Sequence, residues 1–297
     1  MTEPQASPRH PASSTRPHWG AEALWQALVP LLPGLSIEVV QTLDSTNSEL
    51  TDRLRNAGRV QQDRRGGRVG DLFPQMLVAI NQTAGRGRLG RRWHATPGSS
   101  LTFSLALPLH RDDWSGLSLA VGLAVAEALD PAGTHIGLKW PNDLILRDAA
   151  ASEGLPCVAG RKLGGILIES VPVGAQRAAV VGIGINVLPQ PVAEADYGAS
   201  ALAELWPDAT PQDALARIGE PLVRALLAFD SDGFGPMREA YARRDTLLGQ
   251  QVRTTDAEMP EGVADGVDAD GALRVASGGQ VRRVVSGEVS VRLAGGN

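Results

Sequence analysis

The sequence predicts an α+β protein with one large domain of strands and helices, followed by a small all-β module. Apolar residues alternate at strand spacing in several short runs, and between these runs they recur at helical spacing. After residue 250 the pattern changes to short alternating runs separated by Asp-Gly turns. With 297 residues and 43% hydrophobic content, the chain can build a substantial core. We expect a tail at 1–18, a main domain at 19–248 and the β module at 249–297.

The composition excludes several classes of protein. A net charge of -5 argues against a protein whose main partner is DNA or RNA, since such binding draws on a basic face. The single cysteine, Cys157, cannot form an intramolecular disulfide, and the five histidines are not at metal-ligand spacing. The tail at 1–18 lacks the apolar core of a signal peptide and is expected to be disordered. No apolar run reaches the ~18 residues that cross a bilayer, so we expect a cytoplasmic protein without membrane contact.

The individual elements follow from periodicity and from Pro and Gly breakers. Helices are expected at residues 20–32, 115–129, 199–205, 214–229 and 236–247, the last three as packing elements without chemistry. Strands of the main domain are expected at residues 36–41, 76–81, 100–107, 136–140, 144–146, 162–169 and 180–187. Polar or patternless loops are expected at 59–71 and 147–160.

Ser45, Thr46 and Asn47 stand where the second helical pattern begins, with Glu49 in its first turn. Serine and threonine at this position cap helices, so a cap accounts for them. A ligand contact can coexist with the cap, because a helix N-terminus offers free amides to polar ligand atoms.

The stretch GRGRLGRRW at residues 85–93 carries four arginines and three glycines directly after a buried strand. Glycines let a backbone approach an anion closely, and arginines bind phosphate or carboxylate through charge-assisted hydrogen bonds. We interpret this arginine loop as one that orders around a nucleotide and a carboxylate. We predict that it is poorly ordered without ligand, together with part of residues 59–71. A solvated basic turn is the simpler alternative.

The glycines of the arginine loop also match G-x-G-x-x-G, the fingerprint of dinucleotide-binding turns. That fingerprint requires a helix directly after the turn. Here the chain continues through Pro97-Gly98 into the alternating strand at 100–107. The strand-loop-strand context rejects the dinucleotide-binding interpretation.

Polar residues also surround Pro141, between two predicted strands. A Pro-Asn-Asp turn accounts for Asn142 and Asp143. The functional interpretation assigns Asp143 to a metal-bound nucleotide and Lys139 to a phosphate.

A second candidate is Lys162, at the start of the strand KLGGILIE, where a buried lysine requires an anion. The Gly164-Gly165 pair of that strand permits a close approach to its backbone. Asn186 ends the next strand, VVGIGINV.

Together these motifs resemble those of biotin protein ligases, in the family's order and from about residue 36 onward. They are Ser45-Thr46-Asn47, Gln82 with residues 85–93, the KWPND stretch at 139–143, Lys162 to Gly165, Gly184-Ile185-Asn186 and Gly287-Glu288. The arginine loop together with KWPND is the most specific pair. The resemblance implies a core like that of class II aminoacyl-tRNA synthetases, with a mixed sheet and flanking helices, and a C-terminal SH3-like barrel.

The resemblance also implies a reaction. Biotin and Mg-ATP would give biotinyl-5'-adenylate and pyrophosphate, and biotin would then pass to a lysine of the carrier domain of acetyl-CoA carboxylase. A homodimer through a sheet edge is a further family likeness.

Residue roles carry over from the same resemblance. Biotin binding falls to Ser45, Thr46, Asn47, Gln82, Gly85, Arg86, Gly87, Arg88, Lys162 and Gly165. ATP binding falls to Arg91, Trp93, Lys139, Asn142, Asp143 and Asn186. Arg88 and Lys162 are expected to meet the reacting carboxylate and α-phosphate. Asp143 is expected to act as a Mg²⁺ ligand or as a general base.

Two departures and two alternatives accompany this assignment. Bifunctional members carry a DNA-binding winged helix, whereas about 35 residues precede the first strand here, so we expect no DNA binding. The segment between KWPND and Lys162 is longer than in compact members. The nearest alternative is a lipoate- or octanoate-protein ligase of the same fold. A nucleic-acid binder is the alternative of another class, opposed by the acidic net charge and 4% aromatic content.

Overall fold

The fold was taken from a computed structural model that describes residues 19–63, 72–147, 160–174, 176–190, 198–255, 259–285 and 292–293. The predicted tail at 1–18, residues 64–71 of the expected polar loop, most of the 147–160 loop and the Gly287-Glu288 pair lie outside these ranges. Within them, no helix is long and apolar enough to cross a membrane.

The larger of the two described sheets has seven strands in the order β1-β2-β3-β7-β6-β5-β4. Its strands are β1 (Ser36–Leu43), β2 (Gln75–Gln82), β3 (Ser100–Pro108), β4 (Ile136–Lys139), β5 (Asp143–Arg147), β6 (Gly160–Val173) and β7 (Gln176–Asn186). β1 and β2 are parallel, and all other neighbours in this sheet are antiparallel. The predicted mixed sheet is therefore confirmed.

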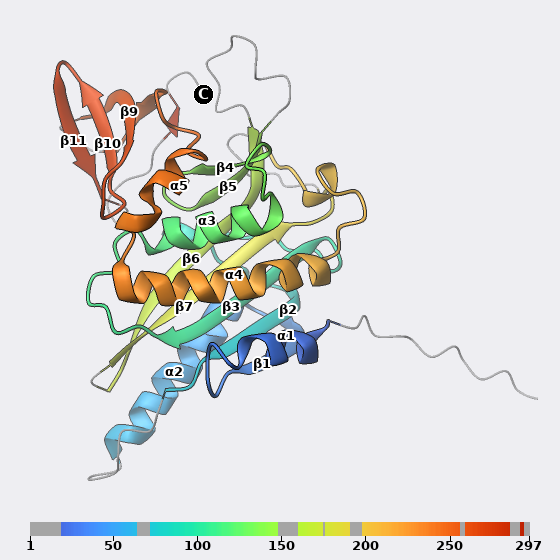
Figure 1. The fold of residues 1–297 in the computed structure, drawn as a ribbon. Helices are drawn as coiled ribbons and strands as arrows, with labels where there is room; N and C mark the ends of the chain where they lie inside the picture. The colour runs from blue at the N-terminus through green and yellow to red at the C-terminus, as the bar shows by residue number, and fades with distance from the viewer. Residues whose placement is uncertain are drawn as a thin grey trace, which may run out of the picture.

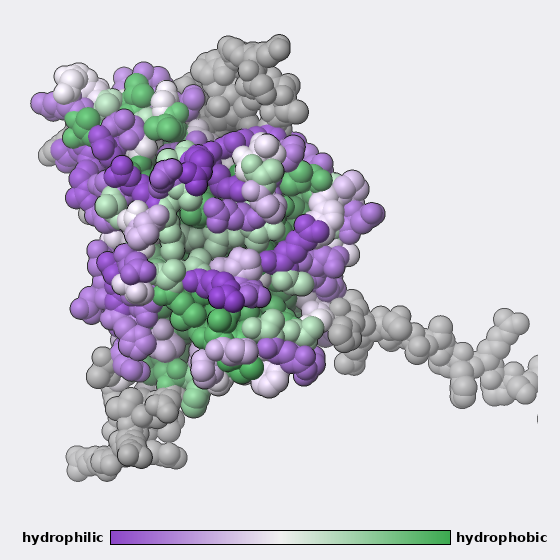
Figure 2. Space-filling model, in the orientation of Figure 1, coloured by the Kyte–Doolittle hydropathy of each residue, from purple (hydrophilic) through white to green (hydrophobic). Residues whose placement is uncertain are grey.

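Helices cover the two faces of this sheet unequally (Figure 1). On one face lie α1 (Ala21–Leu28), α3 (Leu117–Leu129) and α4 (Pro211–Asp232), which share the main apolar core with β3, β6 and β7. On the other face lies α2 (Thr46–Asp63), whose Leu50 and Leu54 belong to a second, smaller core. The surface in Figure 2 is the face of α3 and α4, and apolar side chains show between polar ones over these helices.

The alternation of β3 explains why the two faces differ. Leu101, Phe103 and Leu105 point into the main core, as their period of two requires. Thr102 and Ser104 point to the face of α2, where they are also buried. The apolar half of the strand thus holds the helices, and its small polar half is left for other contacts.

The second sheet is antiparallel, in the order β11-β10-β9-β8-β12. Its strands are β8 (Gln251–Arg253), β9 (Glu261–Val267), β10 (Leu273–Ser277), β11 (Gln280–Val284) and β12 (Arg292–Leu293). Alternation around Asp-Gly turns predicted these short strands, and the small C-terminal β module is confirmed.

The chain between the sheets joins the edge of the first one. Leu138 N donates to Arg244 O at 2.8 Å, and Thr246 N donates to Leu138 O at 3.0 Å, so residues 244–246 pair with β4. Arg244 is buried and lies 3.4 Å from the Asp130 carboxylate. The expected helix at 236–247 is therefore wrong in its second half: only η4 (Gly235–Met237) and α5 (Arg238–Ala242) are helical.

Two further boundaries differ from the predictions. α2 continues to Asp63, so residues 59–63 are helical although their polar composition predicts a loop. The expected helix at 199–205 is reduced to the 3-10 turn η3 (Leu202–Glu204). Residues 198–200 form a bridge to Lys162 instead, because Lys162 N donates to Gly198 O and Ser200 N donates to Lys162 O. At residues 198–200 a long-range contact overrides the local pattern.

Candidate active site

The floor of the site is a stretch of glycines and small hydroxyl residues on the α2 face of β3, β6 and β7. Thr102 pairs with Gly184 and Ser104 pairs with Gly182 across β3 and β7, while Gly165 of β6 pairs with Gly184 from the other side. No side chain rises from the glycines, so other groups can lie directly on the sheet.

Two of these glycines are required by what lies on them. A Cβ at Gly184 would stand 2.4 Å from the ring of Trp93, and one at Gly182 would stand 2.1 Å from Asn47 Oδ1. Trp93 and Asn47 therefore rest on the backbone of β7. Trp93 Nε1 is buried against Gly184 and has no hydrogen-bond partner among the described residues.

At one end of the floor, a buried polar cluster surrounds the start of α2. Thr46 N donates to Gln82 Oε1 at 2.7 Å, and Thr46 Oγ1 lies 3.1 Å from the same oxygen. Ser104 Oγ lies 2.6 Å from both Thr46 Oγ1 and Asn47 Oδ1. Ser45 Oγ accepts a long, 3.5 Å bond from Ser48 N. The helix-cap interpretation is confirmed, and the cap faces the glycine floor.

The arginine loop folds as a tight hairpin above this floor. Trp93 N donates to Gly85 O at 2.9 Å, and Gly87 N donates to Arg91 O at 2.8 Å. A Cβ at Gly85 would stand 2.4 Å from Trp93 O, so only glycine fits at the base of the hairpin. Leu89 at its tip has φ 55 and is 74% exposed. A leucine in the left-handed region carries backbone strain. Whether the loop orders only with ligand remains a prediction.

The arginines of the loop reach both ends of the site. Arg86 forms an ion pair with Glu169 of β6 at 3.2 Å. Arg88 NH1 donates to Asn142 Oδ1 at 3.2 Å. Burial lowers the pKa of the Arg88 guanidinium, and the charge of Asp143 partly opposes this effect. Arg88 remains a cation, since arginine keeps its proton even after such a shift.

A charged cluster forms the other end of the floor. Lys162 Nζ lies 2.6 Å from Asp143 Oδ1, and both side chains are mostly buried. Asn142 Nδ2 donates to Ile166 O at 2.8 Å, which turns its amide oxygen toward Arg88. A Cβ at Gly165 would lie 3.5 Å from Lys162 Nζ, in ordinary contact distance, so this glycine lies directly beneath the cluster.

Not every predicted site residue points at this cluster. Asn186 is buried, with its Nδ2 donating to Lys162 O at 3.3 Å and its Oδ1 accepting from Gln190 at 2.8 Å. Its amide thus holds the backbone of Lys162. Lys139 is buried opposite Asp143 in the β4–β5 hairpin. Trp93 lies over the centre of the floor, between the two ends.

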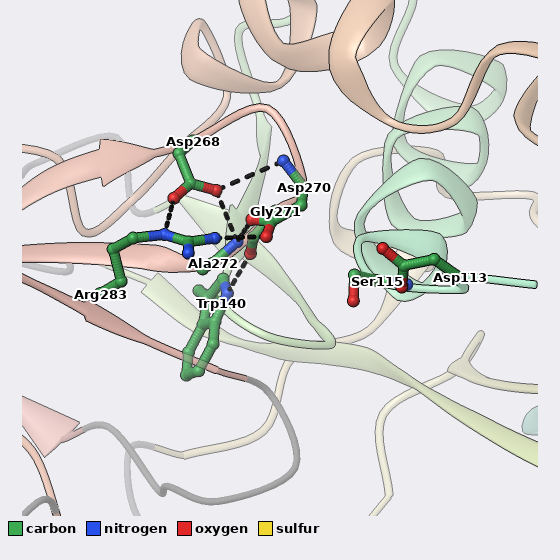
Figure 3. A network of polar contacts seen from close by, with 8 residues as sticks. All are labelled: Asp113, Ser115, Trp140, Asp268, Asp270, Gly271, Ala272 and Arg283. Atoms are coloured by element: carbon green, nitrogen blue, oxygen red, sulfur yellow. Dashed lines mark hydrogen bonds and ion pairs between the residues drawn. The ribbon is translucent and has the colours of Figure 1, made fainter.

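The KWPND turn also contacts the C-terminal sheet (Figure 3). Trp140 is buried, and its Nε1 donates to Gly271 O at 3.0 Å in the turn between β9 and β10. Arg283 of β11 pairs with Asp268 and Asp270 in the same turn. The pKa of Asp270 is lowered to about 2. Its side-chain hydrogen bond with Asp268 is the largest cause, and the bond from Arg283 lowers the pKa further. The turn that carries Asn142 and Asp143 is therefore buttressed by the C-terminal module.

Three residues of the site were missed by the sequence analysis: Ser104, Glu169 and Gly182. Ser104 sits in a strand whose other face is apolar, and Glu169 ends KLGGILIE, so alternation could have placed both on a polar face. Their partners in other segments gave no local signal.

Comparison with known proteins identifies the family. Residues 74–186 match the biotin/lipoate A/B protein ligase family, and residues 247–292 match the biotin protein ligase C terminal domain. The bifunctional ligase/repressor BirA of Escherichia coli is 32% identical over 271 residues, covering 89% of this chain and 76% of that protein. The biotin--[acetyl-CoA-carboxylase] ligase of Mycobacterium tuberculosis is 33% identical over 268 residues, covering 85% and 88%.

A solved structure agrees with these sequence matches. The biotin protein ligase from Aquifex aeolicus, in complex with biotin and ATP, aligns with a TM-score of 0.68 and 26% identity, covering 87% of this chain and 99% of that one. The glycine floor, the arginine hairpin and the Lys162–Asp143 cluster thus stand in a fold shared with that enzyme. The chain belongs to the biotin protein ligase family.

Proposed function

We propose that this chain activates biotin with ATP and transfers it to a lysine of a carboxylase carrier domain. In the first step a carboxylate oxygen of biotin bonds to the α-phosphorus of ATP, and the bond to pyrophosphate breaks. In the second step the carrier amine attacks the acyl carbon, AMP leaves, and the amine loses a proton. A protein nucleophile is not required, since the carboxylate is already ionised.

One observation carries this proposal: a single floor of glycines and small hydroxyl residues joins a polar cluster to a cationic one. Thr46, Asn47 and Gln82 stand at the polar end, suited to the ureido group of biotin. Lys162 and Arg88 stand at the charged end, suited to a carboxylate and a phosphate. The two ends lie apart along the floor, as the ureido group and the carboxylate of biotin are separated by its aliphatic chain, and Asn47 and Trp93 lie directly over Gly182 and Gly184.

The first step brings two anions together, and the cationic end opposes their repulsion. Two unit charges ~4 Å apart repel by about 4 kcal/mol at an effective dielectric of 20. Lys162 and Arg88, held by Asp143 and Asn142, would offset this repulsion without having to reorganise. Trp93 and the hairpin above the floor would exclude water from the reactive adenylate.

Mg²⁺ would be held chiefly by the phosphates of ATP. Within the described ranges, no group of three or more His, Cys, Asp or Glu could bind a metal ion. Mg²⁺ is commonly bound through one or two carboxylates together with substrate phosphates, so a single carboxylate at Asp143 fits this arrangement. Asp143 already contacts Lys162 through Oδ1, which makes positioning of that lysine its first role and leaves proton removal from the carrier as the competing one.

The other partners follow from the same proposal. The carrier domain would approach the charged end, where the adenylate is formed. A homodimer would use the outer edge of β1, because residues 244–246 cover the opposite edge at β4 and no described strand pairs outside β1. We place the reaction in the cytoplasm, where the single Cys157 stays reduced.

Biotin-dependent exchange of pyrophosphate into ATP tests the first step, and transfer of labelled biotin to a carrier domain tests the second. Both should require ATP and Mg²⁺. The same assays with lipoate and octanoate address the alternative, because the matched family includes lipoate ligases. Exchange with lipoate and none with biotin would reject the proposal. The C-terminal match to biotin protein ligases favours biotin.

A further inference from the structure

Glu169 belongs to none of the motifs that point to the reaction, yet its carboxylate touches two of them. It lies in β6, on the same face as Gly165, four residues further along the strand. Its Oε2 accepts from Asn47 Nδ2 at 3.0 Å, and its Oε1 lies 3.2 Å from Arg86 NH1. The side chain is 24% exposed, so the contacts are partly shielded from water.

The contact with Asn47 decides how that side chain presents its amide. A carboxylate can only accept hydrogen bonds, so the amide NH₂ of Asn47 must face Glu169. Its Oδ1 is thereby turned toward Ser104 and the glycine floor, 2.6 Å from Ser104 Oγ. Asn47 Nδ2 also donates to Leu167 O at 3.2 Å, which fixes the same orientation.

The contact with Arg86 holds the arginine loop. Arg86 NH1 also donates to Ser48 Oγ at 3.4 Å, so this arginine bridges β6 and the first turn of α2. Further along the hairpin, Arg88 is bonded to Asn142. Arg86 and Arg88 thus attach the hairpin toward opposite ends of the floor, and Glu169 supplies the attachment at the end of Thr46 and Asn47.

We propose that Glu169 is a positioning residue that latches the arginine loop to the biotin end of the site. One carboxylate orients Asn47 and fastens Arg86, so loop closure and the shape of the ureido site depend on the same group. This assignment rests on the proposed function for its ligand, whereas the latch itself is a property of the protein alone. Glu169 touches no reacting atom and acts through Asn47 and Arg86.

A double-mutant cycle on Glu169 and Arg86 tests the latch without ligand. Glu169→Gln keeps an acceptor for Asn47 and removes the charge that holds Arg86. Trypsin cleavage after Arg88, followed by mass spectrometry, reports how often the loop opens. An ion pair of this exposure predicts that Glu169→Gln and Arg86→Gln each raise the cleavage rate about fivefold. The double variant should show the same fivefold rise, whereas independent effects would multiply to about 25-fold.

Glu220→Gln is the matched control, since it removes an exposed carboxylate that pairs with Arg224 on α4, on the other face of the sheet. Its cleavage rate should equal that of the parent chain. The thermal midpoint of every variant is measured alongside, because a purely structural role would lower the midpoint without coupling to Arg86. Wild-type cleavage in Glu169→Gln, or multiplying effects in the double variant, would overturn the latch.

The half-time of bound biotinyl-5'-adenylate, measured in the same four proteins, connects the latch to the reaction. It should shorten about fivefold in each single variant and no further in the double one. If the chain forms no adenylate but the cleavage rates are coupled, the proposed function is rejected and the latch is supported. If the chain is an active ligase but the parent and the three variants release the adenylate at the same rate, the latch has no role in retaining the ligand.

Discussion

Replacing Lys162 by alanine should strongly slow adenylate formation. Lys162 Nζ is 2.6 Å from Asp143 Oδ1 and lies over Gly165, at the charged end of the floor. The substitution removes one of two cations placed for the reacting oxygens. It also leaves the Asp143 carboxylate without this partner, so a negative charge then faces the two anions that must react.

The size of the effect follows from the charges involved. At ~4 Å and an effective dielectric of 20, one charge pair is worth about 4 kcal/mol. Loss of a single preorganised group of this kind slows catalysis roughly 10²- to 10³-fold in other enzymes. We expect biotin-dependent pyrophosphate exchange to fall at least ~100-fold, equivalent to about 3 kcal/mol in the barrier.

Arg161→Ala provides the matched control for this measurement. Arg161 is the preceding residue of β6, and its guanidinium pairs with Glu204, so it belongs to a different contact. The control removes one positive charge from the same strand and should exchange pyrophosphate at nearly the parent rate. If Lys162→Ala stays folded and forms adenylate as fast as Arg161→Ala, Lys162 has no part in the first step.

Three further substitutions test other parts of the structure. Gly184→Ala places a Cβ 2.4 Å from the ring of Trp93, so it should destabilise the protein by about 1–3 kcal/mol and weaken biotin binding. The control Gly58→Ala, whose Cβ has its nearest neighbour at 3.7 Å, should leave biotin binding unchanged. Denaturant titration measures the stability and calorimetry measures the binding. Burial raises the pKa of Asp245 to about 6, above its unfolded value. The protonated Asp245 therefore contributes to the free energy of unfolding fully below about pH 4, and this contribution is lost as pH rises through 6. Asp245→Asn should remove that slope and stabilise the protein at pH 7.5 by up to ~3 kcal/mol, and equal pH slopes in the two proteins would contradict the assignment. Trp140→Phe leaves the Gly271 carbonyl of the β9–β10 turn without its 3.0 Å donor, so it should lower the free energy of unfolding by about 1–2 kcal/mol. It should also raise the KM for ATP. An unchanged KM would show that this contact with the C-terminal module does not support ATP binding.

Local sequence was enough to place most strands and the motifs that they carry. Alternation from Leu101 to Leu107 identifies β3, and the cap signal at Ser45 marks the start of α2. The arginine loop and KWPND were recognisable because glycine, proline and charge patterns act over a few residues. The same logic failed where a partner lies far away, as at residues 244–246, which leave the helix and bridge to Leu138.

The sequence by itself determined the strand pattern, the cationic loop and the family of reaction that they serve. Only the tertiary structure decided that Glu169 meets Asn47 and Arg86, that Gly184 lies under Trp93, and that Trp140 bonds to a turn 131 residues later in the chain. The physical reason is the distance along the chain over which each interaction acts. Backbone propensity and side-chain periodicity are properties of neighbouring residues, whereas the shared face of three strands is fixed by their register, which depends on the packing of the whole sheet.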